Sequence, residues 1–198
     1  MAKPPKPARP FAEALAAGGL VLDGAMGTAL YERGVLYTAC FEALCESQAD
    51  LVAQVHRAYL EAGAQALTTN TFGANAYRLG HHGLARRVDE LNRAAVCIAR
   101  EVATDRAYVI GSVGPTGVLL KASVQGEAAT IEAAFADQCR ALCAAEVDAI
   151  LLETFRQPKE IELALRAAKT VVPPSIPIIA SVSFDVFGTM SDGMAPSR

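Results

Sequence analysis

Short apolar runs alternate along the chain with longer stretches in which apolar residues recur at helical spacing. The apolar runs cover residues 20–23, 66–69, 108–113, 147–152 and 176–184. They are nearly continuous rather than alternating, which is typical of strands that are buried on both faces of a parallel sheet. The sequence therefore predicts an α/β fold in which helices cover parallel strands.

The stretches between these runs predict amphipathic helices. Their inner faces would be formed by Leu51, Val55, Tyr59 and Ala62, by Val88, Leu91, Ala95, Ile98 and Val102, by Ile131, Phe135, Gln138 and Leu142, and by Ile161, Leu165 and Ala168. Ser47, with a carboxylate three residues later, predicts the start of the first of these helices, and Gly63 predicts its end. Pro158 suits the first position of the last helix. His56 falls near the polar face of its helix, so we expect it to face solvent.

Polar or glycine residues stand at or just past the C-terminal ends of the successive apolar runs. They are Asp23, Asn70, Gly114, Glu153 and Asp185. Strand ends converge on one mouth in a (βα)8 barrel, whereas a doubly wound sheet concentrates its site at one switch point. The distribution over five ends favours a (βα)8 TIM-type barrel. At roughly 40 residues per unit, this chain would carry about the first five βα units of such a barrel.

Composition restricts the class of protein further. The chain has 198 residues, of which 52% are hydrophobic and 20% charged, and its net charge is −3. Residues 11–198 can therefore form a packed core, and the lack of a basic cluster argues against a nucleic-acid partner. Residues 1–10 are basic and rich in proline without an apolar h-region, so we expect a disordered tail rather than a secretory signal. No apolar run approaches the roughly 18 residues of a membrane span.

The five cysteines are Cys40, Cys45, Cys97, Cys139 and Cys143. An odd number spread over a chain of this length indicates reduced thiols and a cytoplasmic location. Cys139 and Cys143 lie four residues apart on one predicted helix and could share a metal. No further His or Cys pair at ligand spacing completes such a set, so buried free thiols are favoured.

Four motifs carry candidate chemistry, each with a structural alternative. DGAMGT (residues 23–28) combines an acidic residue with two glycines, which suits a backbone that approaches a ligand closely. TNTFGAN (residues 69–75) offers hydroxyl and amide groups to a polar small molecule, or forms a turn that merely ends a strand. GSVGPTG (residues 111–117) is no phosphate loop, because no lysine–hydroxyl pair follows its last glycine, but its amides could hold a carboxylate or approach a cofactor.

The fourth motif, LLETF (residues 151–155), places Glu153 at the end of an apolar strand. A carboxylate there must be paired or hydrogen-bonded, and either a ligand ammonium or Arg156 could serve. The neighbouring histidines His81 and His82 lie between glycines and are expected in a surface loop. No lysine stands at a strand end, which argues against a Schiff-base lyase or aldolase.

Taken together, these motifs resemble the homocysteine S-methyltransferase family in order and spacing. DGAMGT follows the first predicted strand, HRAYLEAGAQALTTNTFGAN runs through the second, and GSVGPTG and LLETF come after the third and fourth. The likeness runs from about Phe11 to Asp185. It is strongest with the homocysteine-binding barrels of cobalamin-dependent methionine synthases and of bifunctional homocysteine methyltransferase–methylenetetrahydrofolate reductases. The resemblance implies methyl transfer to homocysteine, giving methionine, from a donor such as methyltetrahydrofolate or methylcobalamin.

The same resemblance implies roles for particular residues. The loop at Asp23, Gly24 and Ala25 would offer amides to the homocysteine carboxylate, and Asp23 and Glu153 would hold its ammonium. The remaining pocket residues would be Thr69, Asn70 and Ser183. In this family three cysteine thiolates hold a zinc ion that binds the homocysteine sulfur as a thiolate.

The family's zinc cysteines lie after the sixth strand and near the eighth, and none of the five cysteines here occupies those positions. No catalytic or metal-ligating residue is therefore assigned to this chain. We expect it to supply the homocysteine-clamp part of an incomplete barrel, truncated before the zinc cysteines. The alternatives are half of a split barrel that a second polypeptide completes, and a catalytically inactive paralogue that binds an amino acid.

Overall fold

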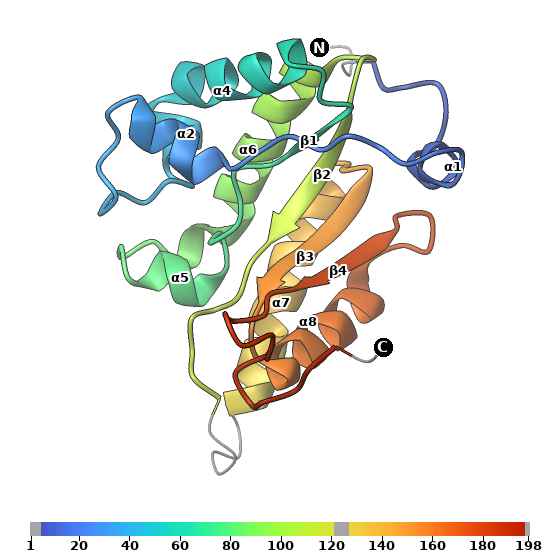
Figure 1. Cartoon of the computed structure of the whole chain (residues 1–198). Helices are drawn as coiled ribbons and strands as arrows, with labels where there is room; N and C mark the ends of the chain where they lie inside the picture. Colours follow the sequence, from blue (N-terminus) through green and yellow to red (C-terminus); the bar gives the residue numbers. More distant parts are fainter. Residues whose placement is uncertain (1–4, 121–126, 197–198) are drawn as a thin grey trace.

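The computed structural model describes residues 5–120 and 127–196. Its centre is a parallel sheet with the strand order β1-β2-β3-β4, formed by Ala66–Thr68, Tyr108–Val113, Ala149–Phe155 and Ile178–Val182 (Figure 1). Each strand pairs with the next one along the chain, and helices occupy the connections. The predicted α/β class is therefore confirmed.

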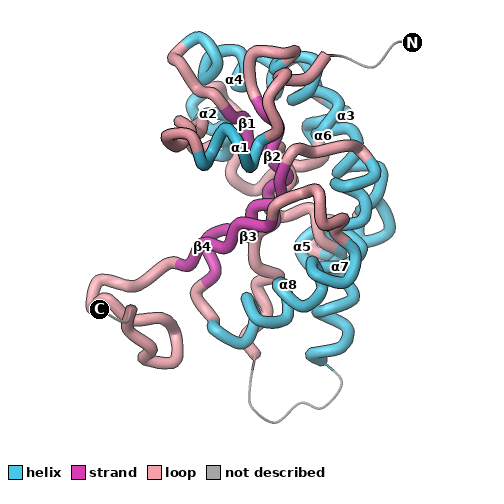
Figure 2. Tube along the Cα trace, turned by 90° about the vertical axis from the view of Figure 1, so that its right-hand side faces the viewer, coloured by secondary structure: helices cyan, strands magenta, loops and turns pink. Residues whose placement is uncertain are grey.

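The helices lie mainly on one side of this sheet. They are α1 (Phe11–Ala16), α2 (Met26–Glu32), α3 (Leu44–Ser47), α4 (Ala49–Glu61), α5 (Ala76–Gly80), α6 (Val88–Ala103), α7 (Glu127–Ala144) and α8 (Pro158–Val171), with a 3-10 turn at Ala85–Arg87. Figure 2 shows α6, α7 and α8 together on one side of the strands. None of the helices in the described part of the chain is long and apolar enough to cross a membrane.

The first predicted strand is reduced to a single bridge. Leu22 pairs in parallel with Ala66, the Gln65 N–H donates to the Val21 carbonyl at 2.8 Å, and the Asp23 N–H donates to the Ala66 carbonyl at 3.0 Å. The segment thus runs beside β1 in the order expected for a first barrel strand. Val21 and Leu22 are largely exposed, so little packing supports a longer strand here.

Successive side chains of each strand point to opposite faces of the sheet, and the two faces are covered differently. One face packs on the helices through Leu67, Val109, Ile150 and Leu152, in the largest apolar cluster. The other face carries Ala66, Tyr108, Ile110 and Ala149, which gather with Phe11 of α1. Continuing that alternation toward the C-terminal ends of β1, β2 and β3 gives Thr68, Ser112 and Glu153. The second face therefore changes from apolar to polar along the strands.

Helix α7 follows the predicted pattern in full, and α8 follows it in part, because Ile161 and Ala168 are buried whereas Leu165 is half-buried. Ile131, Phe135, Gln138 and Leu142 are all buried on α7, and Pro158 lies in the first turn of α8. On α6, Val88, Leu91, Ala95 and Ile98 are buried and Val102 is half-buried.

Helix α4 departs from the prediction in three ways. Its buried side chains are Val52, Val55 and His56, whereas Ala62 is exposed. The solvent-facing prediction for His56 is thus wrong, because α4 packs against both α2 and α6 and buries a broader stripe than one apolar row. Ser47 does not cap α4 either. It is the last residue of α3, and its hydroxyl donates to the carbonyl of Ala43, which precedes α3. Gly63, with φ of +103°, ends the helix as predicted.

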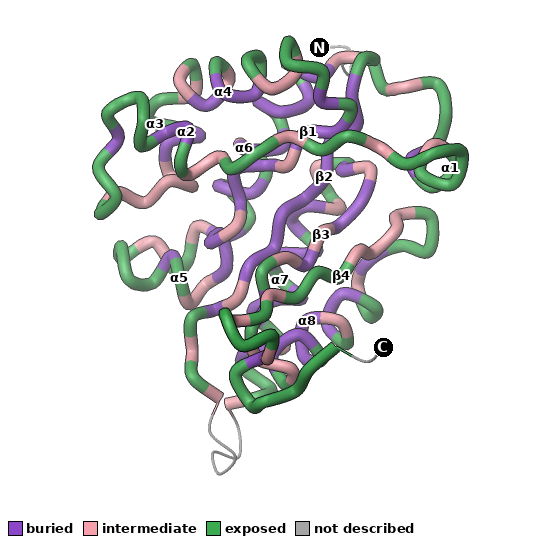
Figure 3. Tube along the Cα trace, in the orientation of Figure 1, coloured by how far each residue is buried: buried purple, intermediate pink, exposed green. Residues whose placement is uncertain are grey.

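The N-terminal tail reaches the starts of β2 and β3. Residues 1–4 of the predicted tail lie outside the described residues, and disorder of the tail remains a prediction. In the described part, the Tyr108 hydroxyl donates to the Arg9 carbonyl at 2.8 Å, and Lys6 Nζ lies 3.4 Å from Asp148 Oδ1. At one edge of the sheet, the residues of β4 are half-buried or exposed, whereas β2 and most of β3 are buried (Figure 3).

Candidate functional site

A cavity of about 810 Å³ opens at the C-terminal ends of the strands. Six of the seven predicted site residues line it: Asp23, Gly24, Ala25, Thr69, Asn70 and Glu153. The seventh, Ser183, is not among its lining residues. Ser183 follows β4, and its N–H donates to the Phe155 carbonyl at 2.8 Å. The structure thus brings together residues from three separate parts of the chain.

Asp23 enters this cavity from the loop beside β1. Its Oδ2 accepts a hydrogen bond from the Thr68 N–H and its Oδ1 accepts one from the Thr68 hydroxyl, both at 2.9 Å. Burial, assisted by the negative charge of Glu153, raises the pKa of Asp23 to about 6, although the bonds from Thr68 oppose this shift. The two carboxylates therefore act on each other electrostatically.

Glu153 reaches the cavity from an irregular part of β3. The pairing of β3 with β4 shifts register between Leu152 and Phe155, and Thr154 has a φ of +64°. Such bulges redirect side chains near the ends of strands, and strained backbone is concentrated at functional sites. The Ser112 hydroxyl of β2 donates a short hydrogen bond to Glu153 Oε1.

Neither carboxylate has an ion-pair partner within residues 5–120 and 127–196. In particular, the alternative pairing of Glu153 with Arg156 is not formed. The end of the cavity that Asp23 and Glu153 share therefore holds two acidic groups that form no ion pair with a described basic side chain. A ligand that carries a cationic group would suit this end of the cavity.

The DGAMGT loop packs closely on α4. A Cβ on Gly24 would lie 2.8 Å from the ring of Tyr59, whose hydroxyl donates to the Ala25 carbonyl at 3.2 Å. Helix α2 begins at Met26, directly after the loop. The first N–H groups of a helix lack acceptors within the helix. Gly24, Ala25, Met26 and Gly27 line the cavity, so the backbone at the start of α2 forms part of its wall.

The TNTFGAN motif serves the scaffold as well as the cavity wall. The Thr69 and Thr71 hydroxyls lie 2.6 Å apart, and the Thr71 hydroxyl donates to the Ser112 carbonyl at 2.7 Å. Asn70 donates from Nδ2 to the Phe41 carbonyl at 2.7 Å, and Asn75 caps α5. These polar side chains are therefore already engaged within the protein, and they order the strand end.

The GSVGPTG motif also turns its amides inward. The Gly114 N–H donates to the Phe72 carbonyl and the Thr116 N–H donates to Glu160 Oε1, each at 2.8 Å. Glu160 belongs to the first turn of α8 and is only 1% exposed. The carboxylate that this motif holds is thus one of the protein's own.

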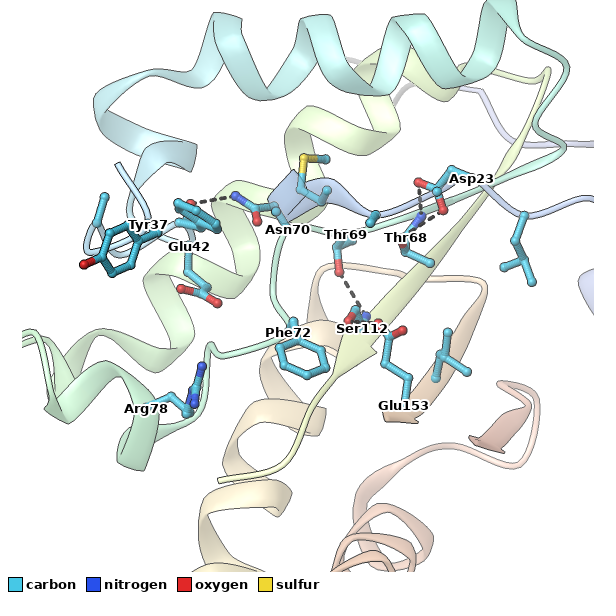
Figure 4. A pocket seen from close by; sticks show the side chains of 18 of the residues that line it. Asp23, Tyr37, Glu42, Thr68, Thr69, Asn70, Phe72, Arg78, Ser112 and Glu153 are labelled. Carbon is cyan, nitrogen blue, oxygen red and sulfur yellow. Dashed lines mark hydrogen bonds between the residues drawn. The ribbon is translucent and has the colours of Figure 1, made fainter. Parts of the chain in front are cut away.

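Several cavity residues were not predicted individually as site residues. Thr68, Ser112, Tyr37, Phe41, Glu42, Phe72 and Arg78 line the cavity, as do the exposed His81 and His82 of the expected surface loop. Figure 4 shows Asp23, Thr68, Ser112 and Glu153 on one side and Tyr37, Glu42 and Arg78 on the other. Alternation within β1 and β2 would have revealed Thr68 and Ser112 as residues of the same face, whereas the loop residues carried no such signal.

The fold and site define a chain of the α/β class, in which a four-stranded parallel sheet carries a polar cavity at its strand ends. Residues 20–198 match the sequence profile of the family described as Homocysteine S-methyltransferase, and the chain belongs to this family. It is 37% identical over 186 residues to the methionine synthase of Mycobacterium tuberculosis, covering 86% of this chain and 16% of that protein. It is 32% identical over 168 residues to betaine–homocysteine S-methyltransferase 1 of Danio rerio, covering 82% and 41%.

Solved structures agree with this family. The metallated form of the homocysteine methyltransferase MmuM from Escherichia coli superposes with a TM-score of 0.78 at 24% identity, which covers 94% of this chain and 71% of MmuM. The oxidized form gives a TM-score of 0.77 at 27% identity, covering 92% and 69%. The chain thus spans about 70% of MmuM but only 16% of the methionine synthase. The fold corresponds to part of the barrel, as the sequence predicted.

The thiols of this chain do not fit the zinc site that the family implies. No group of three or more His, Cys, Asp or Glu side chains suited to a metal gathers in the described ranges. Burial raises the pKa of Cys45 and Cys139 to about 12 and that of Cys143 to about 11. Metal ligation requires thiolates, so these protonated thiols are poor donors. We therefore assign no residue here to metal binding.

Proposed function

We propose that this chain forms the homocysteine-binding part of a homocysteine S-methyltransferase, which transfers a methyl group to homocysteine and gives methionine. The observation that carries the proposal is that Asp23 and Glu153 line the same cavity, close enough to interact electrostatically, and that neither forms an ion pair with a described basic side chain. Family membership supplies the reaction. The geometry supports the binding step, which is the part that these residues can perform.

The two carboxylates would bind the ammonium group of homocysteine. Burial already makes ionisation of Asp23 unfavourable, and the charge of Glu153 adds to that cost. A cation between them would relieve the repulsion and form charge-assisted hydrogen bonds to both. Ligand binding and ionisation of Asp23 would therefore favour each other.

The carboxylate of homocysteine would bind the backbone of residues 24–27. These residues line the cavity and lead into α2, whose first N–H groups lack acceptors within the helix. Thr69 and Asn70 would form the adjoining wall, held in place by their own hydrogen bonds. Ser183, which follows β4, would complete the floor of the pocket.

The chemistry at sulfur would require groups outside the residues described here. In this family zinc activates the homocysteine thiol, and the proposed donors are methyltetrahydrofolate or methylcobalamin. The further segment or second polypeptide that completes the barrel would supply the zinc ligands. This chain's own contribution is to bind homocysteine in the cytoplasm and to orient it toward that metal.

Calorimetric titration with L-homocysteine tests the proposal. Glu153→Gln removes the charge but keeps an oxygen that accepts from Ser112, so the hydrogen bond to β2 is retained. We expect affinity to fall by about ten- to a hundredfold, as befits the loss of a charge-assisted hydrogen bond of about 1.5–3 kcal/mol. Glu162→Gln, an exposed change on α8, should leave affinity unchanged.

A melting curve of each variant separates binding from scaffold effects. A lower melting temperature of Glu153→Gln with unchanged affinity would show that Glu153 stabilises the barrel and does not bind ligand. Methionine formation distinguishes the enzyme from an inactive amino-acid-binding paralogue. The enzyme interpretation expects turnover once the polypeptide with the zinc cysteines is added, whereas the paralogue interpretation expects none.

A further inference from the structure

The hydroxyl of Ser112 and the carboxylate of Glu153 form a bond between neighbouring strands inside the cavity. Ser112 is 2% exposed, and its Oγ donates a short hydrogen bond to Glu153 Oε1. We infer that Ser112 is a positioning residue, which fixes one oxygen of Glu153 so that the other is presented to the ammonium of the ligand. This inference rests on the proposed function, and it assigns a role that the family motif alone did not indicate.

Strand register explains why these two side chains meet. Ser112 pairs with Leu151 in the β2–β3 ladder, and Glu153 lies two residues further along β3. Residues two apart on a strand share a face, so Glu153 is a diagonal neighbour of Ser112. A long side chain spans such a diagonal, and the serine hydroxyl is short enough to leave the cavity open.

The backbone of Ser112 is itself held firmly. Its N–H donates to the Thr69 hydroxyl at 3.1 Å, and its carbonyl accepts from the Thr71 hydroxyl at 2.7 Å. Gln138 of α7 also donates to that carbonyl, at 3.4 Å. The hydroxyl of Ser112 therefore projects from an ordered point, which a positioning group requires.

Glu153 needs such a constraint for two reasons. Its side chain has several rotatable bonds and emerges beside the irregular backbone at Thr154. Asp23 shares the cavity, and repulsion between the two carboxylates would drive an untethered Glu153 toward solvent. Thr68 tethers Asp23 in the same manner, so each acidic group is held by a hydroxyl residue of the adjacent strand.

A matched pair of variants isolates the hydroxyl. Ser112→Thr retains the hydroxyl. Ser112→Val places a side chain with nearly the shape of threonine but without the hydroxyl, and both threonine and valine are favoured in strands. In calorimetric titrations of the full chain, we expect homocysteine to bind Ser112→Val about three- to tenfold more weakly than Ser112→Thr. Binding of 4-mercaptobutyrate, which lacks the ammonium, should be equal in the two variants. Equal homocysteine affinities, or an equal loss for both ligands, would overturn the positioning role.

A second measurement does not depend on homocysteine. Carbon-13 NMR titration of the Asp23 carboxyl should give a lower pKa in Ser112→Val than in Ser112→Thr, because an untethered Glu153 moves its charge away. The same pKa in both variants would overturn the inference. If the pKa values differ but wild type and both variants bind no homocysteine, the positioning of Glu153 is supported and the proposed function fails.

Discussion

Thr68 donates two hydrogen bonds to Asp23, one from its backbone N–H and one from its hydroxyl, each 2.9 Å long. Together they fix the carboxylate of the first loop to the first strand of the sheet. These bonds favour the ionised form of Asp23, yet burial outweighs them and raises its pKa to about 6. Under the proposed function, this balance would set the pH range in which the cavity holds the ligand ammonium.

Homocysteine affinity should therefore depend on pH through Asp23. Above about pH 7 the carboxylate is ionised and binding is strongest, whereas protonation below pH 6 removes one of the two negative charges. We expect affinity to fall steadily below pH 6, by up to about tenfold per pH unit. Calorimetric titrations between pH 5 and 8 measure this, and Asp23→Asn should bind weakly with a flat profile over that range.

The stability of the protein should also depend on pH, through His56. This side chain is fully buried, both ring nitrogens lack a hydrogen-bond partner in the structure, and burial lowers its pKa to about 4. The unfolded chain binds the proton near pH 6.5, so stability is complete above that pH and falls as the pH drops toward 4. The loss should approach about 3 kcal/mol.

Urea unfolding of wild type and His56→Leu at pH 8 and pH 5 tests this linkage. The leucine variant removes both unpartnered nitrogens, so it should lose less stability between the two pH values than wild type. If both proteins lose the same stability, His56 is not the group responsible for the acid sensitivity.

Sequence patterns predicted the buried row most fully on α7, where all four predicted residues are buried. On α8, Ile161 and Ala168 are buried as predicted, whereas Leu165 is half-buried. Helix α4 contacts α2, α3 and α6 as well as β1, and this wider contact buries His56 where one apolar row could not indicate it. The predicted strand at residues 20–23 is reduced to one bridge at Leu22, because the side chains of Val21 and Leu22 are largely exposed to solvent.

The candidate site was predictable where polar residues interrupt apolar runs. Asp23 and Glu153 stood out for that reason, and the structure places both on one cavity. Ser112 could not be recognised as the partner of Glu153, because their contact depends on the register between β2 and β3. The sequence predicts amides in GSVGPTG that are available to a ligand, but Glu160, which is distant in sequence, accepts a hydrogen bond from the Thr116 N–H.

Two arginines of α6 should differ sharply in their contributions to stability. Arg100 is buried and donates to Asp148 Oδ2 at 2.7 Å, while Arg93 pairs with Asp89 at the surface. Arg100→Ala removes a buried cation from the half-buried carboxylate of Asp148 and should cost about 2–4 kcal/mol. Arg93→Ala should cost under about 1 kcal/mol. Urea unfolding of the two variants measures the difference, and equal losses would contradict the burial argument.

The contact between Gly114 and Phe72 should be intolerant of a methyl group. A Cβ on Gly114 would lie 2.5–2.6 Å from three ring atoms of Phe72, and the Gly114 N–H bonds to the Phe72 carbonyl at 2.8 Å. The ring would have to move into the cavity. We expect Gly114→Ala to destabilise the protein by about 1–3 kcal/mol. Gly18→Ala is the control, since no atom lies within 4 Å of its Cβ.

A double-mutant cycle shows whether that loss arises at Phe72. Phe72→Leu shortens the side chain, so Gly114→Ala should cost less in its presence than in wild type, with a coupling energy of about 1 kcal/mol. Thermal unfolding of the four proteins provides the cycle. Additive losses would mean that the methyl group is accommodated elsewhere, and the ring would then not be the element that fixes the GSVGPTG turn against the cavity.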